Sequence, residues 1–271
     1  MYPFTYHRPK TIAEARRLFE TSESASLLSG GHTLLPAMKL RLSMANDLID
    51  LGDIAQMRGI ESGQGTLWIG SSMRHAEVAA SAPVRELIPA LAGLAGSIGD
   101  RHVRHRGTIG GSIANNDPAA DYPAAALGLG ATIITDRREL LADDFFTGLY
   151  TTALQPGEIV TRIKFPVPLL ACYAKFRSPA SRYSIAGVFV SRTGQGVRVA
   201  VTGAGANGVF RVTEFETALD ADFRPEALTN CRVDPSMLMG DQNGTPEYRA
   251  ELIKVMARRA VESPNRAQSF K

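Results

Sequence analysis

The pattern of apolar and polar positions over residues 1–56 predicts a small unit in which helices and strands alternate. Thr11 and Glu14 have the spacing of a capping box, so a helix is expected to begin at Thr11. Its apolar positions share one helical face and are Ile12, Ala15, Leu18 and Phe19. The following elements are an apolar strand at 26–28, a glycine turn at 29–33, a turn or short helix at 34–42 and a strand at 47–51. This order is typical of an α/β unit.

Further strands and helices are predicted between this unit and residue 166. A turn-rich segment at 59–66 marks the boundary with the first unit. Strands are predicted at 66–70, 131–135 and 159–165, and helical patterns at 75–80 and 84–98. A basic stretch at 101–106 leads into a glycine-rich segment at 107–114. Pro166 and Pro168 then interrupt the chain, so a domain boundary is expected near residue 166.

The last hundred residues predict a different arrangement, with strands first and helices afterwards. The strand-like segments are 173–176, 185–190 and 197–201, and the helices are 214–219 and 247–261. Thr245 is a predicted cap for the second helix, and Pro246 occupies its first position, where proline is favoured. This order indicates a small α+β domain.

Composition narrows the class of protein. Of 271 residues, 44% are hydrophobic and 21% are charged, as in ordinary globular proteins. No apolar run reaches the roughly 18 residues that a membrane span needs, and the first residues have no apolar core of a signal peptide, so a cytoplasmic location is expected. The 30 basic and 27 acidic residues nearly balance, and a net charge of +3 is too small for a typical nucleic-acid-binding protein. Cys172 and Cys231 form no CxxC pair, which disfavours a disulfide framework, a zinc site or an iron–sulfur cluster within this chain.

Two glycine loops are the candidates for cofactor chemistry. The first is Ser29-Gly30-Gly31-His32-Thr33, and the second is Thr108-Ile109-Gly110-Gly111-Ser112, with Asn115, Asn116 and Asp121 downstream. A buried pyrophosphate needs converging backbone amides, and glycine lets the backbone approach closely. A single glycine pair is more often an ordinary tight turn, and that alternative stays open for each loop alone. Two such loops, each with hydroxyl donors, favour a nucleotide cofactor.

The other motifs in the sequence give weaker evidence for a function. Residues 203–208 fit GxGxxG, but residues 209–212 are extended in character, whereas a Rossmann motif opens directly into a helix. A glycine-rich connection is therefore expected there. His102 and His105 have the spacing of metal ligands, but neighbouring arginines would repel a cation. No triad or paired-carboxylate constellation can be identified by spacing, so nothing indicates hydrolase chemistry.

The two loops and their flanking residues resemble a known family. The first loop with the following LLPAMKLRL, and the stretch VRHRGTIGGSIANNDPAADYP at 103–123, are similar to the two flavin loops of the FAD-binding medium subunit of molybdenum hydroxylases, the relatives of xanthine dehydrogenase and carbon monoxide dehydrogenase. Residues 175–177 with 181–183 resemble a third element near the flavin, and 202–205 with 216–219 resemble the family's C-terminal domain. The resemblance covers essentially the whole chain.

The resemblance implies an α+β fold with three parts. Two α/β lobes would form a vanillyl-alcohol-oxidase/PCMH-type FAD-binding domain, followed by a C-terminal α+β domain with an antiparallel sheet. The implied divisions are FAD-binding lobe 1 at 1–56, FAD-binding lobe 2 at 57–166, and a C-terminal CO-dehydrogenase-flavoprotein-like domain at 167–271.

The resemblance also implies roles for individual residues. Residues 30–33 and 108–111 would hold the FAD pyrophosphate, Asp121 would hydrogen-bond near the ribose, and Lys175 and Tyr183 would approach the isoalloxazine. The full set of implied FAD contacts is Ser29, Gly30, Gly31, His32, Thr33, Leu34, Thr108, Ile109, Gly110, Gly111, Ser112, Asn116, Asp121, Ile159, Lys175 and Tyr183. His105 and Ser112 stand where many relatives have asparagine. Ser112 can still donate a hydrogen bond, so a modified contact is expected. No catalytic residue or metal ligand is implied.

The function implied by the resemblance is electron transfer within a molybdenum hydroxylase complex. The FAD of this subunit would take electrons from the [2Fe–2S] clusters of a small iron–sulfur subunit and pass them to an external acceptor, while a large molybdopterin subunit oxidises the substrate. The assembly would be a dimer of heterotrimers. Two alternatives remain: a stand-alone flavin-dependent oxidase with the two-loop fold, and a non-catalytic scaffold that has lost FAD.

Overall fold

Lobe 1, at the amino-terminal end, is built on a parallel sheet in the computed structural model, which describes residues 1–265 and 267–270. The sheet has the order β1-β3-β2, and both outer strands run parallel to β3. Its elements are β1 (Thr5–His7), α1 (Ile12–Thr21), β2 (Ala25–Leu28), α2 (Leu34–Lys39), β3 (Asp47–Asp50) and the 3₁₀ turns η1 (Leu51–Asp53) and η2 (Ala55–Met57). Thr11 caps α1 as predicted, since its hydroxyl accepts the Glu14 amide at 3.1 Å.

Lobe 2 is built on an antiparallel sheet of order β4-β5-β10-β6-β7. Its strands are β4 (Ile60–Gly63), β5 (Thr66–Gly70), β6 (Thr132–Thr135), β7 (Glu139–Leu141), the short pair β8 (Phe146–Gly148) and β9 (Thr151–Thr152), and β10 (Val160–Pro166). Its helices are α3 (His75–Ala80), α4 (Ala82–Leu87), α5 (Pro89–Ser97), α6 (Arg101–Arg106), α7 (Ile109–Asn115), α8 (Asp121–Leu129) and α9 (Ala142–Phe145).

The helix predicted over 84–98 is wrong as a single element. The chain leaves helical geometry at Ile88 (φ −139°, ψ 69°), and α5 starts at Pro89. Proline has no amide hydrogen and crowds the preceding residue out of the helical region, so it begins a new helix there. The glycine segment at 107–114 differs as well, because most of it forms α7.

The C-terminal domain is a mixed sheet with helices on one face. The sheet order is β14-β13-β12-β11-β15, antiparallel except that β15 runs parallel to β11. The strands are β11 (Leu170–Arg177), β12 (Ser184–Thr193), β13 (Gly196–Thr202), β14 (Phe210–Arg211) and β15 (Ala267–Phe270). The helical elements are α10 (Thr213–Ala221), η3 (Pro225–Leu228), η4 (Pro235–Met237) and α11 (Pro246–Glu262). Residues 203–208 lead into a strand, as expected for a glycine-rich connection and not for a Rossmann motif.

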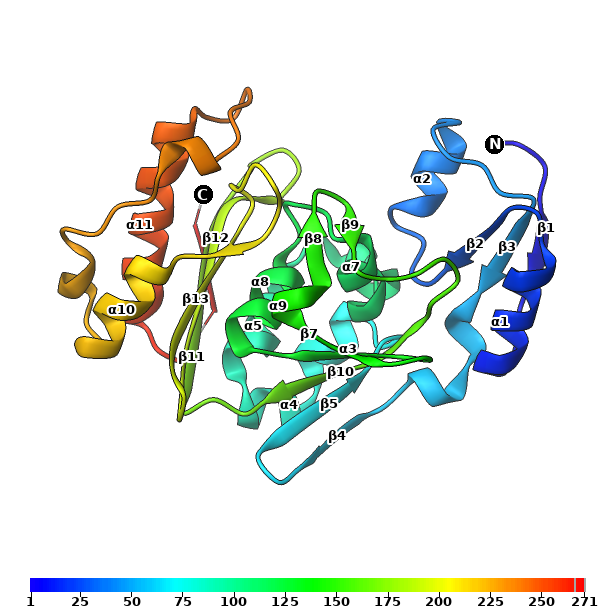
Figure 1. Ribbon diagram of the computed structural model, residues 1–271, viewed down its shortest axis with the longest axis horizontal. Coiled ribbons are helices and arrows are strands. Elements are labelled where there is room, and N and C mark those ends of the chain that lie inside the picture. Colours follow the sequence, from blue (N-terminus) through cyan, green and yellow to red (C-terminus); the bar gives the residue numbers. More distant parts are fainter. Residues whose placement is uncertain (266, 271) are drawn as a thin grey trace.

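The two faces of this sheet pack against different partners. Alternate side chains point to opposite faces of a strand. Tyr173, Phe189 and Ala200 join the core of lobe 2, where α8 lies, whereas Ala174, Val188 and Val199 join α10 and α11 in a separate core. Lobe 2 therefore lies between lobe 1 and the C-terminal domain, as Figure 1 shows.

The chain mixes parallel and antiparallel sheets with helices and has the predicted α+β fold. Within the part of the chain that the structure describes, no helix is long and apolar enough to cross a membrane.

Candidate functional site

A cavity of about 690 Å³ is lined by residues of all three parts of the chain. This volume is typical of small-molecule and cofactor sites. The first glycine loop, the start of α7, the α5–α6 turn and residues 180–183 contribute to its wall. Both glycine loops therefore line one cavity, although they are far apart in the sequence.

The two loops touch each other directly. The hydroxyls of Ser29 and Thr108 are 2.7 Å apart and form a hydrogen bond. A Cβ atom on Gly30 would lie 2.7 Å from the Cα of Gly107, which leaves no room for a side chain. A Cβ on Gly111 would lie 2.9 Å from the Thr108 hydroxyl. Glycine at position 30 is required for the close approach of the two backbones, and glycine at position 111 leaves room for the capping hydroxyl of Thr108.

The first loop presents free backbone amides. Gly31 has a positive φ of +76°, which reverses the chain between β2 and α2. Among the described residues, the amides of residues 30–33 have no hydrogen-bond acceptor. Consecutive amides of this kind form a concave site for an anion such as a phosphate.

The second loop contributes in a different way from the one predicted. The amides of Ile109 and Gly110 already donate to the carbonyls of Met73 and Ser71, at 3.0 and 2.8 Å. The Gly111 amide donates to the capping hydroxyl of Thr108 at 3.1 Å. These three amides therefore fix the start of α7, and the part of this loop that faces the cavity consists of Thr108, Gly110, Gly111 and Ser112.

The cavity wall also holds two buried polar groups that the sequence analysis did not select. Ser71 and His75 line the cavity. The Ser71 hydroxyl and the His75 Nδ1 atom are buried and have no hydrogen-bond partner among the described residues. Burial lowers the pKa of His75 to about 4, so its ring is neutral at pH 7. Unpartnered buried polar atoms are costly in an empty site, and both fit a polar ligand. The available signal was that Ser71 directly follows strand β5 and that His75 begins helix α3.

Three of the residues implied as FAD contacts do not line the cavity. Ile109 is fully buried in the core of lobe 2. Asn116, at the end of α7, uses its side-chain amide to donate to the carbonyls of Gly148 and Thr151, at 2.8 and 2.9 Å. Lys175 is fully buried, and its ammonium binds the Asp121 carboxylate at 2.9 Å. Lys175 thus lies behind Asp121 and not on the cavity wall, and its approach to the flavin stays a prediction.

Asp121 lines the cavity but is held from behind. Its carboxylate accepts hydrogen bonds from the side chains of Lys175, Ser184 (2.8 Å) and Tyr173. Lys175, Ser184 and Tyr173 belong to the C-terminal sheet, whereas Asp121 begins α8 of lobe 2. The group thus fixes the C-terminal domain to the cavity wall.

The other implied contacts do line the cavity, and they give it two different ends. Leu34 and Ile159 lie on the wall, and apolar side chains such as Leu51 and Met57 gather near Ile159. Tyr183 is 49% exposed and lies on the wall with residues 180–182. Partial desolvation of its phenol and the nearby Asp117 carboxylate raise the pKa of Tyr183, so the phenol stays protonated at neutral pH.

The residues present fit a flavin dinucleotide. Free amides suit a diphosphate, glycine lets the two loops pack closely beside the cavity, and the cavity continues to the apolar residues around Ile159 and to Tyr183.

Residues 2–168 match the family model described as the FAD binding domain in molybdopterin dehydrogenase. The chain is 33% identical to the carbon monoxide dehydrogenase medium chain of Afipia carboxidovorans, with 96% of each chain covered. It is 31% identical to the nicotine 6-hydroxylase medium subunit of Paenarthrobacter nicotinovorans, over 94% of this chain and 95% of that one. A solved structure of reconstituted CO dehydrogenase from Oligotropha carboxidovorans aligns with a TM-score of 0.87 at 32% identity, covering 97% of this chain and 98% of that chain. The chain belongs to the family of FAD-binding medium subunits of molybdenum hydroxylases, and FAD is its cofactor.

Proposed function

We propose that this chain is the electron-transfer subunit of a molybdenum hydroxylase complex, and that its FAD takes electrons from iron–sulfur clusters and passes them to an external acceptor. The observation that carries the proposal is the joint cavity of the two glycine loops, in a chain similar to medium subunits over nearly its whole length. The chemistry that bound FAD supplies is redox chemistry that links one-electron carriers to two-electron acceptors.

The residues of this chain would bind and orient the cofactor. The amides of residues 30–33 would face the diphosphate, and the Ser29–Thr108 hydrogen bond would keep both loops at a fixed separation. The apolar end near Ile159 would exclude water. At the other end, Tyr183 would cover the ring system as a protonated phenol, a packing surface and not a base. The expectation that Ser112 donates a modified contact stays part of this proposal.

The proposed partners are a small iron–sulfur subunit and a large molybdopterin subunit, assembled as a dimer of heterotrimers. The relatives are named as medium chains or subunits, and their names refer to carbon monoxide, nicotine and glyceraldehyde. These molecules have little recognition chemistry in common. We therefore place substrate recognition in the large subunit and electron relay in this one.

Co-expression with the neighbouring reading frames tests the proposal. We expect this chain to co-purify with an iron–sulfur and a molybdenum subunit, and to carry a flavin absorption band that bleaches when the iron–sulfur clusters are reduced. Rapid mixing of the reduced complex with dioxygen, a quinone or NAD⁺ then identifies the acceptor by the return of the flavin band.

Two results would contradict the proposal. Turnover of an organic substrate by this chain and FAD alone would indicate a stand-alone oxidase. A complex that purifies without flavin, and takes up none from added FAD, would indicate a scaffold.

A further inference from the structure

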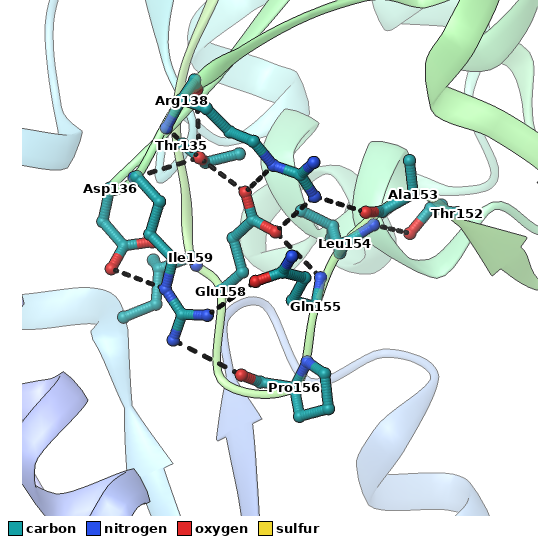
Figure 2. Close-up of polar contacts among 11 residues, drawn as sticks. Thr135, Asp136, Arg138, Thr152, Ala153, Leu154, Gln155, Pro156, Glu158 and Ile159 are labelled. Atoms are coloured by element: carbon teal, nitrogen blue, oxygen red, sulfur yellow. Dashed lines mark hydrogen bonds and ion pairs between the residues drawn. The ribbon is translucent and has the colours of Figure 1, made fainter.

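Glu158 lines the apolar end of the cavity beside Ile159, but its carboxylate belongs to a buried ion pair and presents no free oxygen to the cavity. The Glu158 carboxylate, which is buried, has both oxygens fully used. One oxygen accepts hydrogen bonds from the Thr135 hydroxyl (2.8 Å) and from Arg138 Nε (2.9 Å). The other accepts from Arg138 Nη2 (2.9 Å) and from the backbone amide of Gln155 (2.8 Å). Figure 2 shows this arrangement. Since no oxygen is left for a ligand, Glu158 acts on the residues around it.

These hydrogen bonds fix the turn formed by residues 155–159, which we call the Glu158 turn. The Arg138 guanidinium also donates to the carbonyl of Ala153 at 2.6 Å, so Arg138 binds both sides of the turn. Asp136 fixes the end of the turn, because its carboxylate accepts the Ile159 amide at 2.8 Å and its amide donates to the Ile159 carbonyl at 2.9 Å. The turn is therefore attached to the β6–β7 hairpin of lobe 2 at both of its ends.

The other side of the Glu158 turn contacts lobe 1. Ile159 is 1% exposed and belongs to the same apolar cluster as Ala15, Ile49 and Ile54. Gly157 has a positive φ of +71°, and a Cβ there would lie 2.5 Å from the ring of Phe19 on α1. Ile159 also lines the cavity. A segment of lobe 2 thus completes the core of lobe 1 at the edge of the FAD site.

We propose that Glu158 and Arg138 are positioning residues that hold the Glu158 turn between the two lobes, and so set the width of the FAD cavity and the affinity for FAD. The pair acts through the turn and does not bind FAD. This inference rests on the cavity being the FAD site of the proposed function, and it is independent of partners and acceptor.

The charge on Glu158 is maintained over a wide pH range. Hydrogen bonds from Arg138 lower the pKa of Glu158 to about 2. The contribution of the pair is therefore present above the ordinary carboxyl pKa and is lost when the pH falls towards 2. The effects of the variants below should be the same at pH 5.5 and pH 8.

Titration of the full-length apoprotein with FAD, followed by quenching of flavin fluorescence, tests the proposal. Glu158→Gln and Arg138→Met should each raise the Kd, because loosened lobes are less often in the binding geometry. If the fraction of molecules whose lobes are in the FAD-binding geometry falls to one tenth, the apparent Kd for FAD rises about tenfold. The matched control is Arg162→Met, which breaks the 2.8 Å ion pair with Glu61 on the same sheet, since neither residue lines the cavity. Its Kd should be that of the wild type.

Hydrogen exchange of the apoproteins separates positioning from general destabilisation. In Glu158→Gln, the amides of Gln155 and Ile159 should lose protection, while strand β12 keeps it. Exchange that rises equally in β12, or a Kd that stays at the wild-type value, would overturn the proposal. This arm is informative even if the wild-type chain fails to bind FAD, a result that would count against the proposed function instead.

A second variant changes the lobe 1 side of the contact with the Glu158 turn. Phe19→Ala removes the ring that packs on Gly157 and leaves every hydrogen bond of Glu158 in place. It should raise the Kd for FAD. The Kd of the double variant Phe19→Ala/Glu158→Gln should be close to the higher of the two single-variant values, because both changes act through one contact. Effects that simply multiply would show that the ion pair and the lobe contact are independent, which the proposal does not allow.

Discussion

Single glycines decide how closely the two loops of the proposed FAD site approach the neighbouring backbone. At Gly30 the obstacle to a side chain is the backbone at Gly107, and at Gly110 it is the backbone of Ser71, 2.7 Å from a Cβ. Backbone atoms cannot rotate away as a flexible side chain can. A methyl group at either position must therefore move a whole loop, and the two loops carry the groups that would face the diphosphate.

Gly30→Ala is expected to separate the loops and to lower FAD affinity by more than tenfold. The added carbon would push the first loop from residue 107 and stretch the hydrogen bond between Ser29 and Thr108. Equilibrium titration with FAD measures the change. Gly194→Ala is the control, because a Cβ at Gly194 meets nothing within 4 Å. Equal affinities for the two variants would contradict a close approach of the loops.

His75 should make the stability of the apoprotein depend on pH. Its pKa is lowered to about 4 by burial, against 6.5 in the unfolded chain. Between these values the unfolded chain binds the extra proton, so stability is complete above pH 6.5 and falls as the pH decreases towards 4. The full difference corresponds to about 3 kcal/mol.

Urea unfolding at pH 7 and pH 5 measures this effect, and His75→Gln is the comparison because it removes the titrating group. We expect the wild type to lose more free energy of unfolding between the two pH values than the variant does. The same loss in both proteins would show that the ring is accessible to protons in the folded state.

At the scale of elements, the sequence predicts what local periodicity determines. The helices α1, α3, α10 and α11 and the strands β11, β12 and β13 lie where apolar spacing places them. Strand β1 was missed, because its three residues become a strand by pairing with β3, some forty residues away. The glycines of α7 are poor helix formers, so the sequence predicts a loop there. The structure forms a helix because the Thr108 cap and the burial of Ile109 and Ile113 compensate.

In the candidate site, too, features set by the local sequence could be predicted, whereas features set by tertiary contacts could not. The glycine loops could be selected from composition, because an anion needs free amides and glycine exposes them. The roles of Lys175 and Asn116 could not, because a buried lysine or amide takes whichever partner the tertiary fold supplies. Here those partners are Asp121 and the β8–β9 carbonyls.

Thr108→Val tests whether the cap of α7 matters to the site and not only to the helix. It removes the acceptor for the Gly111 amide and the partner of Ser29. Loss of the cap should cost about 1 kcal/mol of stability, and FAD affinity should fall as well. Thr245→Val removes the similar cap of α11, where the hydroxyl accepts the Tyr248 amide at 3.3 Å. It should lower stability by a similar amount without changing the Kd for FAD, and a change in both variants would argue against a local effect.

At the scale of the whole molecule, the cavity is closed by contacts between parts that are distant in sequence. Lobe 1 receives the Glu158 turn from lobe 2, and the C-terminal sheet supplies Lys175, Tyr173 and Ser184 to Asp121. Lobe 2 thus lies between its two neighbours (Figure 1). It contacts both of them through residues that line the cavity or bind to its wall. Binding of FAD should therefore stabilise the chain as a unit, by an amount set by RT ln(1 + [FAD]/Kd).

Removal of the Lys175 charge is expected to affect both stability and FAD binding. Lys175→Met leaves the Asp121 carboxylate buried without its cation, which typically costs about 3–5 kcal/mol. Since Asp121 lines the cavity, its displacement should also raise the Kd for FAD. Lys175→Met/Asp121→Asn removes the unpaired charge and should recover part of the stability. Urea unfolding and FAD titration measure the two effects.

Arg249→Met provides the control for this prediction. Arg249 is also buried, at 2% exposure, and its guanidinium donates to the carbonyls of Ile185 and Gly203 and to Asp241. These partners all belong to the C-terminal domain. The variant should therefore be destabilised as Lys175→Met is, yet bind FAD like the wild type while folded. If the Lys175 and Arg249 variants lose FAD affinity to the same extent, the Lys175–Asp121 pair has no special place in the cavity, and general loosening of the C-terminal domain accounts for both.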